Sequence, residues 1–99
     1  MKWTDITTYS RGDKVREPRI WELKLTDSIW LNVHKYVGCG DAWFVTARVM
    51  NQNTSMNCVD LQTDNLECAK ARAIMKMRAL LKDVRQQIDN ATSALYEVE

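Results

Sequence analysis

The sequence has little proline and glycine, with one proline and three glycines among its 99 residues. Because these residues most often mark linkers and turns, their scarcity leaves no segment that would separate two domains. No internal repeat or low-complexity tract divides the chain either. With 45% hydrophobic residues, a chain of this length has the composition of one small globular domain. We therefore expect a single domain over residues 1–99.

The sequence also lacks an excess of charge of one sign. Lysine and arginine total 14, aspartate and glutamate total 13, and the formal net charge is +1. A nearly neutral chain has no overall field that would attract nucleic acid or an anionic membrane. No apolar run approaches the roughly 20 residues that a membrane span needs, and the first ten residues contain no signal-peptide core. We expect a cytoplasmic protein with no membrane partner.

Few residues are suited to metal or covalent chemistry. The three cysteines, Cys39, Cys58 and Cys68, form no C-x-x-C pair, and an odd set of this kind indicates reduced thiols rather than disulfides or zinc ligands. The one histidine, His34, has no nucleophile motif around it, and with Cys39 it would supply two of the four ligands of structural zinc. We expect no cofactor, no metal and no enzymatic activity.

Apolar and polar residues alternate in three stretches after Pro18, over residues 19–26, 29–37 and 43–49. This period of two indicates half-buried strands, and the short turn signals between them favour hairpins. A shorter strand is indicated around residues 56–61. The sequence therefore predicts an α+β fold in which an antiparallel meander of three to four strands, over residues 18–62, packs on one long C-terminal helix. Residues 1–17, which have no periodicity, form an N-terminal arm.

The helix is expected over residues 63–95. Asp64 precedes Glu67 by three residues, which is a capping-box arrangement with aspartate as the N-cap. Apolar residues then recur at intervals of three and four and form one stripe: Leu66, Ala73, Met77, Leu80, Leu81, Val84, Ile88, Ala91 and Leu95. We expect fraying before Tyr96, because glutamates beyond it sit badly at the negative end of the helix dipole.

Such a helix would be ~48 Å long, whereas a strand of eight residues spans ~27 Å. Its far end therefore extends past the sheet. Either the helix breaks near residues 89–93, where short polar side chains compete for backbone hydrogen bonds, or its end packs elsewhere, including on a second copy of the chain. The sequence leaves both alternatives open.

Two surfaces are candidates for binding. If the helix covers the face with Trp21 and Leu23, the opposite sheet face carries mixed aromatic and basic side chains: Lys24, Trp30, His34, Tyr36, Phe44 and Arg48. This face is either additional core covered by the arm or a second subunit, or a protein interface, or a platform for single-stranded nucleic acid. On the helix, Arg78, Lys82 and Arg85 share one flank, which is either a solvated face or a phosphate-contacting ridge.

Several segments together carry a resemblance to a known group of proteins. These are the opening "KWTDITTYSRGD", Pro18-Arg19, the strand with Trp21 and Leu23, Trp43, and the helix entry "LQTDNLECAKARA". They resemble a group of small uncharacterised proteins encoded by bacteriophages and prophages. The Arg-Gly-Asp tripeptide within the opening is interpreted as part of a connector between the arm and the sheet. The resemblance implies an origin in a bacterial host's cytoplasm and no catalytic residues.

The leading functional hypothesis is a non-enzymatic phage-type binding protein. Small phage proteins without catalytic motifs commonly bind a host or phage protein, so we expect inhibition or modulation of a host defence protein, as anti-CRISPR proteins do. The alternative is a single-stranded nucleic-acid-binding accessory protein that uses the basic residues of the sheet face and the helix flank. A homodimer is the third possibility.

Overall fold

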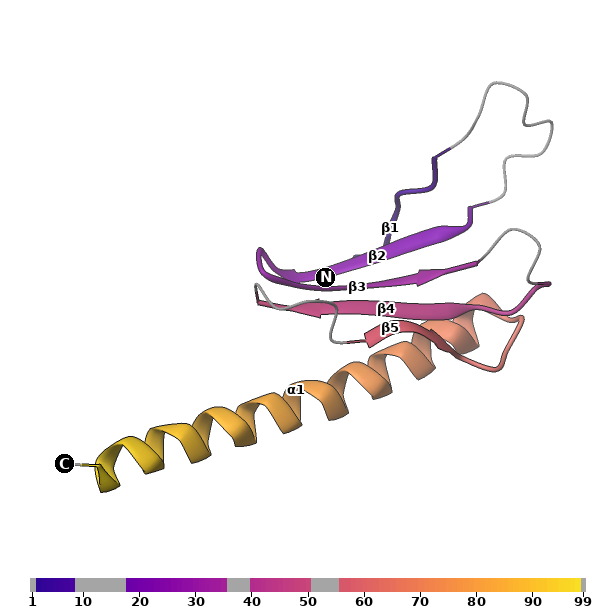
Figure 1. Cartoon of the computed structure of the whole chain (residues 1–99). Coiled ribbons are helices and arrows are strands. Elements are labelled where there is room, and N and C mark those ends of the chain that lie inside the picture. Colours follow the sequence, from indigo (N-terminus) through magenta and orange to yellow (C-terminus); the bar gives the residue numbers. More distant parts are fainter. Residues whose placement is uncertain (1, 9–17, 36–39, 51–55, 99) are drawn as a thin grey trace.

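The computed structural model describes residues 2–8, 18–35, 40–50 and 56–98, and these confirm the predicted α+β fold. One antiparallel sheet packs on one long C-terminal helix (Figure 1). The elements are β1 (Thr4–Asp5), β2 (Ile20–Thr26), β3 (Ile29–His34), β4 (Phe44–Val49), β5 (Met56–Asp60) and α1 (Leu66–Glu97). The sheet has five strands rather than the three to four expected.

The strands lie in the sheet in the order in which they occur in the chain, and each pairs antiparallel with the one before it. Leu23 on β2 lies opposite Leu31 on β3, which lies opposite Ala47 on β4. Because side chains alternate between faces along a strand, this register places the apolar positions of the three central strands on one face. The period of two in the sequence is thus the pattern of a sheet with one buried face.

β1 is the strand that the sequence did not predict. Its two residues pair with β2, with Thr4 opposite Glu22 and Asp5 opposite Trp21. The pairing continues through Ile6, whose backbone N–H donates to the carbonyl of Ile20 at 2.9 Å. The Thr7 hydroxyl then accepts hydrogen bonds from the backbone N–H groups of residues 19 and 20, at 2.8 and 3.0 Å. Two residues are too few to show a period, which is why this edge strand was missed.

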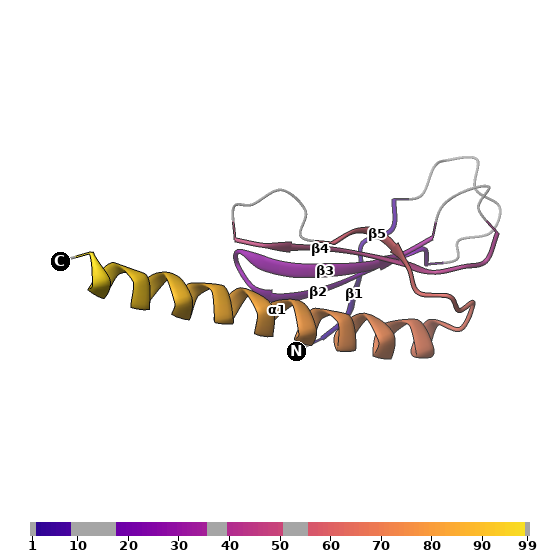
Figure 2. The same ribbon diagram turned by 60° about the horizontal axis from the view of Figure 1, so that its bottom comes forward.

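The core lies between the inner face of the sheet and α1, which runs beneath it in Figure 2 and packs on β3 and β4. Its buried side chains are Leu23, Leu31, Val33, Trp43, Val45, Ala47, Val49, Leu61, Ala69, Ala73 and Met77. The small residues on this list include Ala69 and Ala73 at a spacing of four, where α1 faces the sheet. A small side chain at such positions lets the backbones of helix and sheet approach closely. The N-terminal half of α1 therefore packs directly on the sheet.

Lys70 connects α1 to the edge of the sheet that β1 and β2 form. Its ammonium lies 4.4 Å from the ring centroid of Trp21 and 5.6 Å from that of Trp3. A cation over the face of an indole is attracted by the ring quadrupole, more strongly where water is partly excluded. The Lys70 side chain is 15% exposed, and its ammonium also lies 3.7 Å from the Glu67 carboxylate. The N-terminal arm is thereby held to α1 through Trp3.

Asn65, and not Asp64, is the N-cap of α1. The Asn65 side-chain oxygen accepts a hydrogen bond from the backbone N–H of Cys68 at 2.9 Å, which satisfies one of the unpaired donors of the first turn. The backbone carbonyl of Asp64 instead accepts from the Trp43 indole N–H at 3.1 Å. The N-cap is therefore one residue later than the sequence pattern indicates, and the residue before it is bonded to Trp43.

α1 is continuous from Leu66 to Glu97, so the alternative of a break near residues 89–93 is wrong, as is fraying before Tyr96. The polar side chains in this stretch form hydrogen bonds to residues one turn away in the same helix, and these bonds do not compete with the helical backbone bonds. The Thr92 hydroxyl donates to the Ile88 carbonyl at 2.9 Å, and the Gln86 amide donates to the Asn90 side chain at 3.0 Å. These i to i+4 contacts are compatible with helical backbone.

The far end of α1 extends beyond the sheet, as Figure 1 shows. All residues from 85 to 98 are exposed, and the molecule measures 64 Å along its long axis against 25 Å across. We call residues 85–98 the helix tail. At 1.5 Å per residue the tail adds about 20 Å of helix. The α1 residues that pack against the core end at Val84.

Candidate interaction surface

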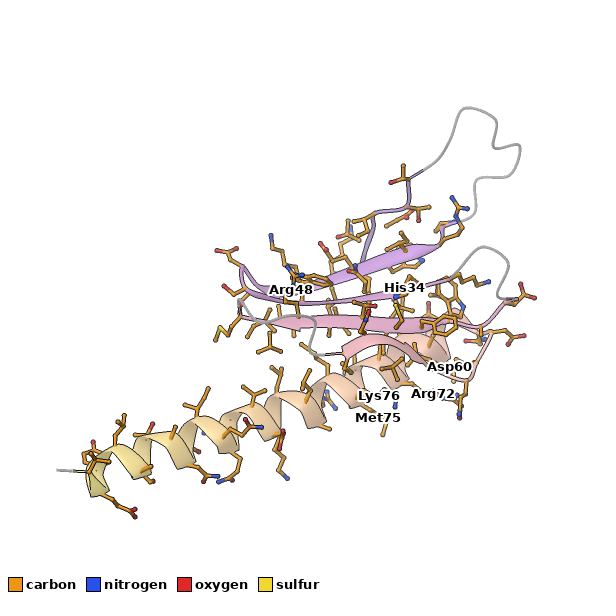
Figure 3. The ribbon with its side chains drawn as sticks, in the orientation of Figure 1. His34, Arg48, Asp60, Arg72, Met75 and Lys76 are labelled. Atoms are coloured by element: carbon orange, nitrogen blue, oxygen red, sulfur yellow. The ribbon has the colours of Figure 1, made fainter. Side chains whose placement is uncertain are left out.

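Five of the six predicted interaction residues lie on the face of the sheet opposite α1. We call this the open face, and its central side chains are Lys24, Trp30, Asn32, His34, Phe44, Thr46 and Arg48. The sixth predicted residue, Tyr36, lies outside the described residues. In Figure 3, His34 and Arg48 lie toward opposite ends of the sheet, with the helix residues Met75 and Lys76 below it.

One end of the open face is a cross-strand row of an aromatic residue between two bases. Trp30 on β3 lies opposite Lys24 on β2 and opposite Arg48 on β4. The Arg48 guanidinium carbon lies 5.7 Å from the centroid of the Trp30 ring. Lys24 and Arg48 are exposed, whereas Trp30 is half-buried. This row therefore presents a flat apolar surface with two accessible positive charges.

The other end of the open face is built around His34. Its ring stacks on Phe44 of the neighbouring strand, with centroids 6.2 Å apart and planes inclined by 25°. The Nε2 atom lies 2.8 Å from the Thr46 hydroxyl oxygen. Burial lowers the pKa of His34 below its ordinary value of 6.5, because the imidazolium would lose hydration there. The ring is therefore neutral at pH 7 and acts as an aromatic and hydrogen-bonding group rather than a cation.

Thr46 links this aromatic pair to the bulged strand β5. Its hydroxyl oxygen accepts a hydrogen bond from the Cys58 backbone N–H at 3.1 Å and lies 3.7 Å from the Cys58 sulfur. The register shifts here, so that Val45 pairs with Val59 while Ala47 pairs with Met56. Cys58 has a positive φ of 53°, which residues other than glycine adopt uncommonly. With the Cys58 N–H directed at its hydroxyl, Thr46 contacts both β5 and His34.

A hollow of about 570 Å³ opens beside His34. The described residues that line it are Thr7, Thr8, Arg19, Ile20, Asn32, His34, Lys35 and Thr46. The side-chain oxygen of Asn32 is buried and has no hydrogen-bond partner in the described part of the chain. A buried acceptor without a partner is uncommon in folded proteins, and Asn32 is one of the residues that line the hollow.

The described part of the N-terminal arm does not cover the open face. Residues 4–6 pair along the outer edge of β2, and Trp3 packs on the core side with Trp21. Thr7 and Thr8 reach the rim of the hollow, where the Thr8 carbonyl accepts from the Arg19 guanidinium at 3.1 Å. Residues 9–17, which include the Arg-Gly-Asp tripeptide, lie outside the described residues.

The basic helix flank lies on the other side of the molecule. Arg78, Lys82 and Arg85 are all exposed on α1, and Arg78 lines an apolar hollow of about 420 Å³ between α1 and β2. Because α1 covers the inner face of the sheet, the sheet itself separates this flank from the open face. A ligand would have to pass around a sheet edge to contact both surfaces at once.

The described residues contain no cluster of three or more His, Cys, Asp or Glu side chains that could hold a metal ion. Neither Cys58 nor Cys68 forms a disulfide, and Cys39 lies outside the described residues. The described residues contain one helix, α1, and although it is 32 residues long it is not apolar enough to cross a membrane.

Sequence reasoning missed two residues of this surface. Asn32 alternates with Trp30 and His34 on β3, so its place on the open face could have been inferred from the period of the strand. Arg19 had no such signal, because its position beside Thr8 depends on the unpredicted strand β1. The aromatic and basic residues stand out by type, whereas a short polar residue such as Asn32 does not.

Comparisons with known proteins add no relative. No family model matches the chain, and neither the curated proteins nor the solved structures contain one significantly similar to it.

Proposed function

We propose that the protein is a non-enzymatic binding protein that contacts a partner protein through the open face. The observation that carries this proposal is the pairing of aromatic with basic or polar side chains across neighbouring strands: Trp30 with Arg48, and His34 with Phe44. Tryptophan and arginine are the residues most enriched at binding hot spots. The side chains come from paired strands, so a partner meets a surface that is already ordered and little side-chain entropy is lost on binding.

The hollow beside His34 supports the same proposal. The row formed by Lys24, Trp30 and Arg48 alone would offer area without direction, whereas the hollow at the other end of the face adds polar side chains, among them Asn32 and Lys35. Hydrogen bonds to polar groups of this kind fix the orientation of a partner, because leaving them unpaired on binding costs free energy. A partner segment that fills the hollow while covering Trp30 is the geometry that we propose.

The partner that we propose is a host protein of a bacterium, such as a defence protein that the binding inhibits. This step depends on the resemblance to phage-encoded proteins. Single-stranded nucleic acid is the alternative ligand, and it is less well supported because the basic helix flank does not adjoin the open face.

A pulldown from bacterial lysate with two matched double variants tests the proposal. Trp30→Ala with Arg48→Ala removes the aromatic and cationic pair, whereas Met75→Ala with Lys76→Ala removes a large apolar residue and a cation from an exposed part of α1. We expect wild type and the helix variant to retain the same protein, and the open-face variant to lose it. Equal retention by all three, or empty eluates throughout, would contradict the proposal.

A titration with single-stranded oligonucleotides at increasing salt tests the alternative. Neutralising phosphates releases counterions, so a true nucleic-acid site loses affinity steeply as salt rises. We expect no such binding if the open face serves a protein partner.

A further inference from the structure

We infer that the hollow between α1 and β2 binds a free fatty carboxylate of medium chain length, with its alkyl chain inside and its carboxylate at Arg78. We call this site the apolar hollow. Its volume is about 420 Å³, and small-molecule sites typically have ~300–1,000 Å³. Apart from Trp3 and Arg78, the described residues that line it have aliphatic or thioether side chains: Leu23, Leu25, Leu31, Ile74, Met77 and Leu81.

The walls of the apolar hollow favour an alkyl chain as the ligand. Leu23, Leu31 and Met77 are at most 7% exposed and belong to the core, whereas Leu25, Ile74 and Leu81 are half-buried. A chain that enters the hollow removes the exposed parts of the half-buried side chains from water, which is the main favourable term in apolar binding. An unbranched alkyl chain also has no polar atom that would lose its hydrogen bonds there.

Trp3 limits the length of the ligand that fits. It precedes Thr4, which pairs with Glu22 on β2, and its ring lies 5.6 Å from the Lys70 ammonium. The apolar hollow is therefore bounded by the start of the chain as well as by the sheet and α1. A partner helix would need a longer groove, because its apolar anchors are spread over residues i to i+7. One short chain fits the bounded site better.

Arg78 provides the charge that selects an anionic ligand. It is exposed, and it is the one charged side chain among the described residues that line the apolar hollow. None of the described carboxylates forms an ion pair with it. A guanidinium group binds a carboxylate through two parallel hydrogen bonds, so Arg78 fits the head group of a fatty acid.

The other charges on this flank of α1 support an anion at the same place. Lys82 and Arg85 follow Arg78 at intervals of four and three residues, which keeps all three on one side of the helix. Glu67 and Asp89 are the acidic residues on this side, and they lie eleven residues before and after Arg78, about 16 Å along the helix. The rim of the apolar hollow is therefore locally positive, although the whole chain is nearly neutral.

This site is separate from the open face. The apolar hollow lies between the sheet and α1, whereas Trp30 and Arg48 lie on the opposite side of the sheet. The inference therefore does not depend on the proposed function, and each can fail without the other.

Calorimetric titration with decanoate, below the concentration at which it forms micelles, tests the inference with two matched variants. We expect saturable binding of one decanoate per chain. Arg78→Ala should weaken binding roughly tenfold, since it removes hydrogen bonds to a charged group. Arg85→Ala is the control, because Arg85 is an exposed base on the same flank that does not line the apolar hollow, and it should bind decanoate as wild type does.

The head group is tested with decanol, which has the same chain and no charge. Wild type should bind decanol more weakly than decanoate, and Arg78→Ala should bind decanol as wild type does. No saturable binding of decanoate, or equal losses in Arg78→Ala and Arg85→Ala, would overturn the inference. Binding to phosphatidylglycerol vesicles without binding of free decanoate would identify a membrane surface as the ligand and would also overturn it.

Methyl NMR spectra locate the bound chain. Decanoate should shift the methyl signals of Leu25, Ile74 and Met77, which line the apolar hollow. Shifts centred on Ile88 and Leu95, which are exposed on the helix tail, would show binding to apolar surface outside the apolar hollow and would contradict the assignment.

Discussion

The Arg48 guanidinium lies over the Trp30 indole, with 5.7 Å between the guanidinium carbon and the ring centroid. Because Arg48 is exposed, a cation–π contact of this kind stabilises the fold by only about 0.5–1 kcal/mol. We therefore expect Arg48→Ala to lower the free energy of unfolding by about 1 kcal/mol or less, measured by urea denaturation. A loss several times larger would show that Arg48 holds the sheet together rather than serving as a binding residue.

We expect substitution of Leu31 to lower the free energy of unfolding more than substitution of most other residues. It is fully buried between α1 and the sheet, so Leu31→Ala loses apolar burial and leaves a cavity, which costs about 2–5 kcal/mol. The matched control is Met75→Ala, since Met75 is 69% exposed on α1 and its loss should change stability by less than about 0.5 kcal/mol. Thermal or urea unfolding of both variants measures the difference, and equal effects would contradict the placement of the core.

The N-cap can be tested with two neighbouring substitutions. Asn65→Ala removes the acceptor for the Cys68 N–H and should destabilise the protein by about 1 kcal/mol. Asp64→Ala should have an effect within about 0.5 kcal/mol, because only the backbone carbonyl of Asp64 bonds to Trp43. The reverse order of effects, read from chemical denaturation, would restore Asp64 as the cap.

His34 should make stability depend on pH. Its pKa in the folded protein lies below the value of 6.5 that an unfolded chain would show, so the unfolded state takes up a proton first as the pH falls. The contribution of neutral His34 to the free energy of unfolding is therefore fully present above pH 6.5, and it is lost progressively as the pH drops below that value. We expect His34→Gln to flatten the fall in unfolding free energy between about pH 7 and pH 5, a window chosen because most carboxylates stay ionised there. An identical slope in both proteins would rule out this role.

Much of the fold follows from local patterns in the sequence. The alternation of residues 20–26, 29–34 and 44–49 defines three strands, and the apolar stripe of α1 defines the helix, because each of these segments buries a single face. What could not be predicted depends on contacts between distant segments. β1 pairs with β2, and Thr7 continues this pairing through bonds to residues 19 and 20. Just before α1, the Asp64 carbonyl accepts a hydrogen bond from Trp43.

The candidate surface was predictable in outline for the same reason. Alternation alone places Trp30, His34, Phe44 and Arg48 on one face once the strands are assigned. It does not reveal that the Cys58 N–H turns toward Thr46, because that depends on a register shift between two strands. Nor does it reveal the hollow, which requires the unpredicted contact between Thr8 and Arg19.

The sequential order of the strands has a consequence for how the chain folds. Each strand pairs with the one that precedes it, so the sheet can grow one hairpin at a time. The longest connection, residues 6–19, joins β1 to β2. The N-terminal half of α1 packs on this sheet, whereas no residue of the tail packs against the core among the described residues. Because the tail adds nothing to the core, we expect substitutions there to leave the folding rate of the chain nearly unchanged.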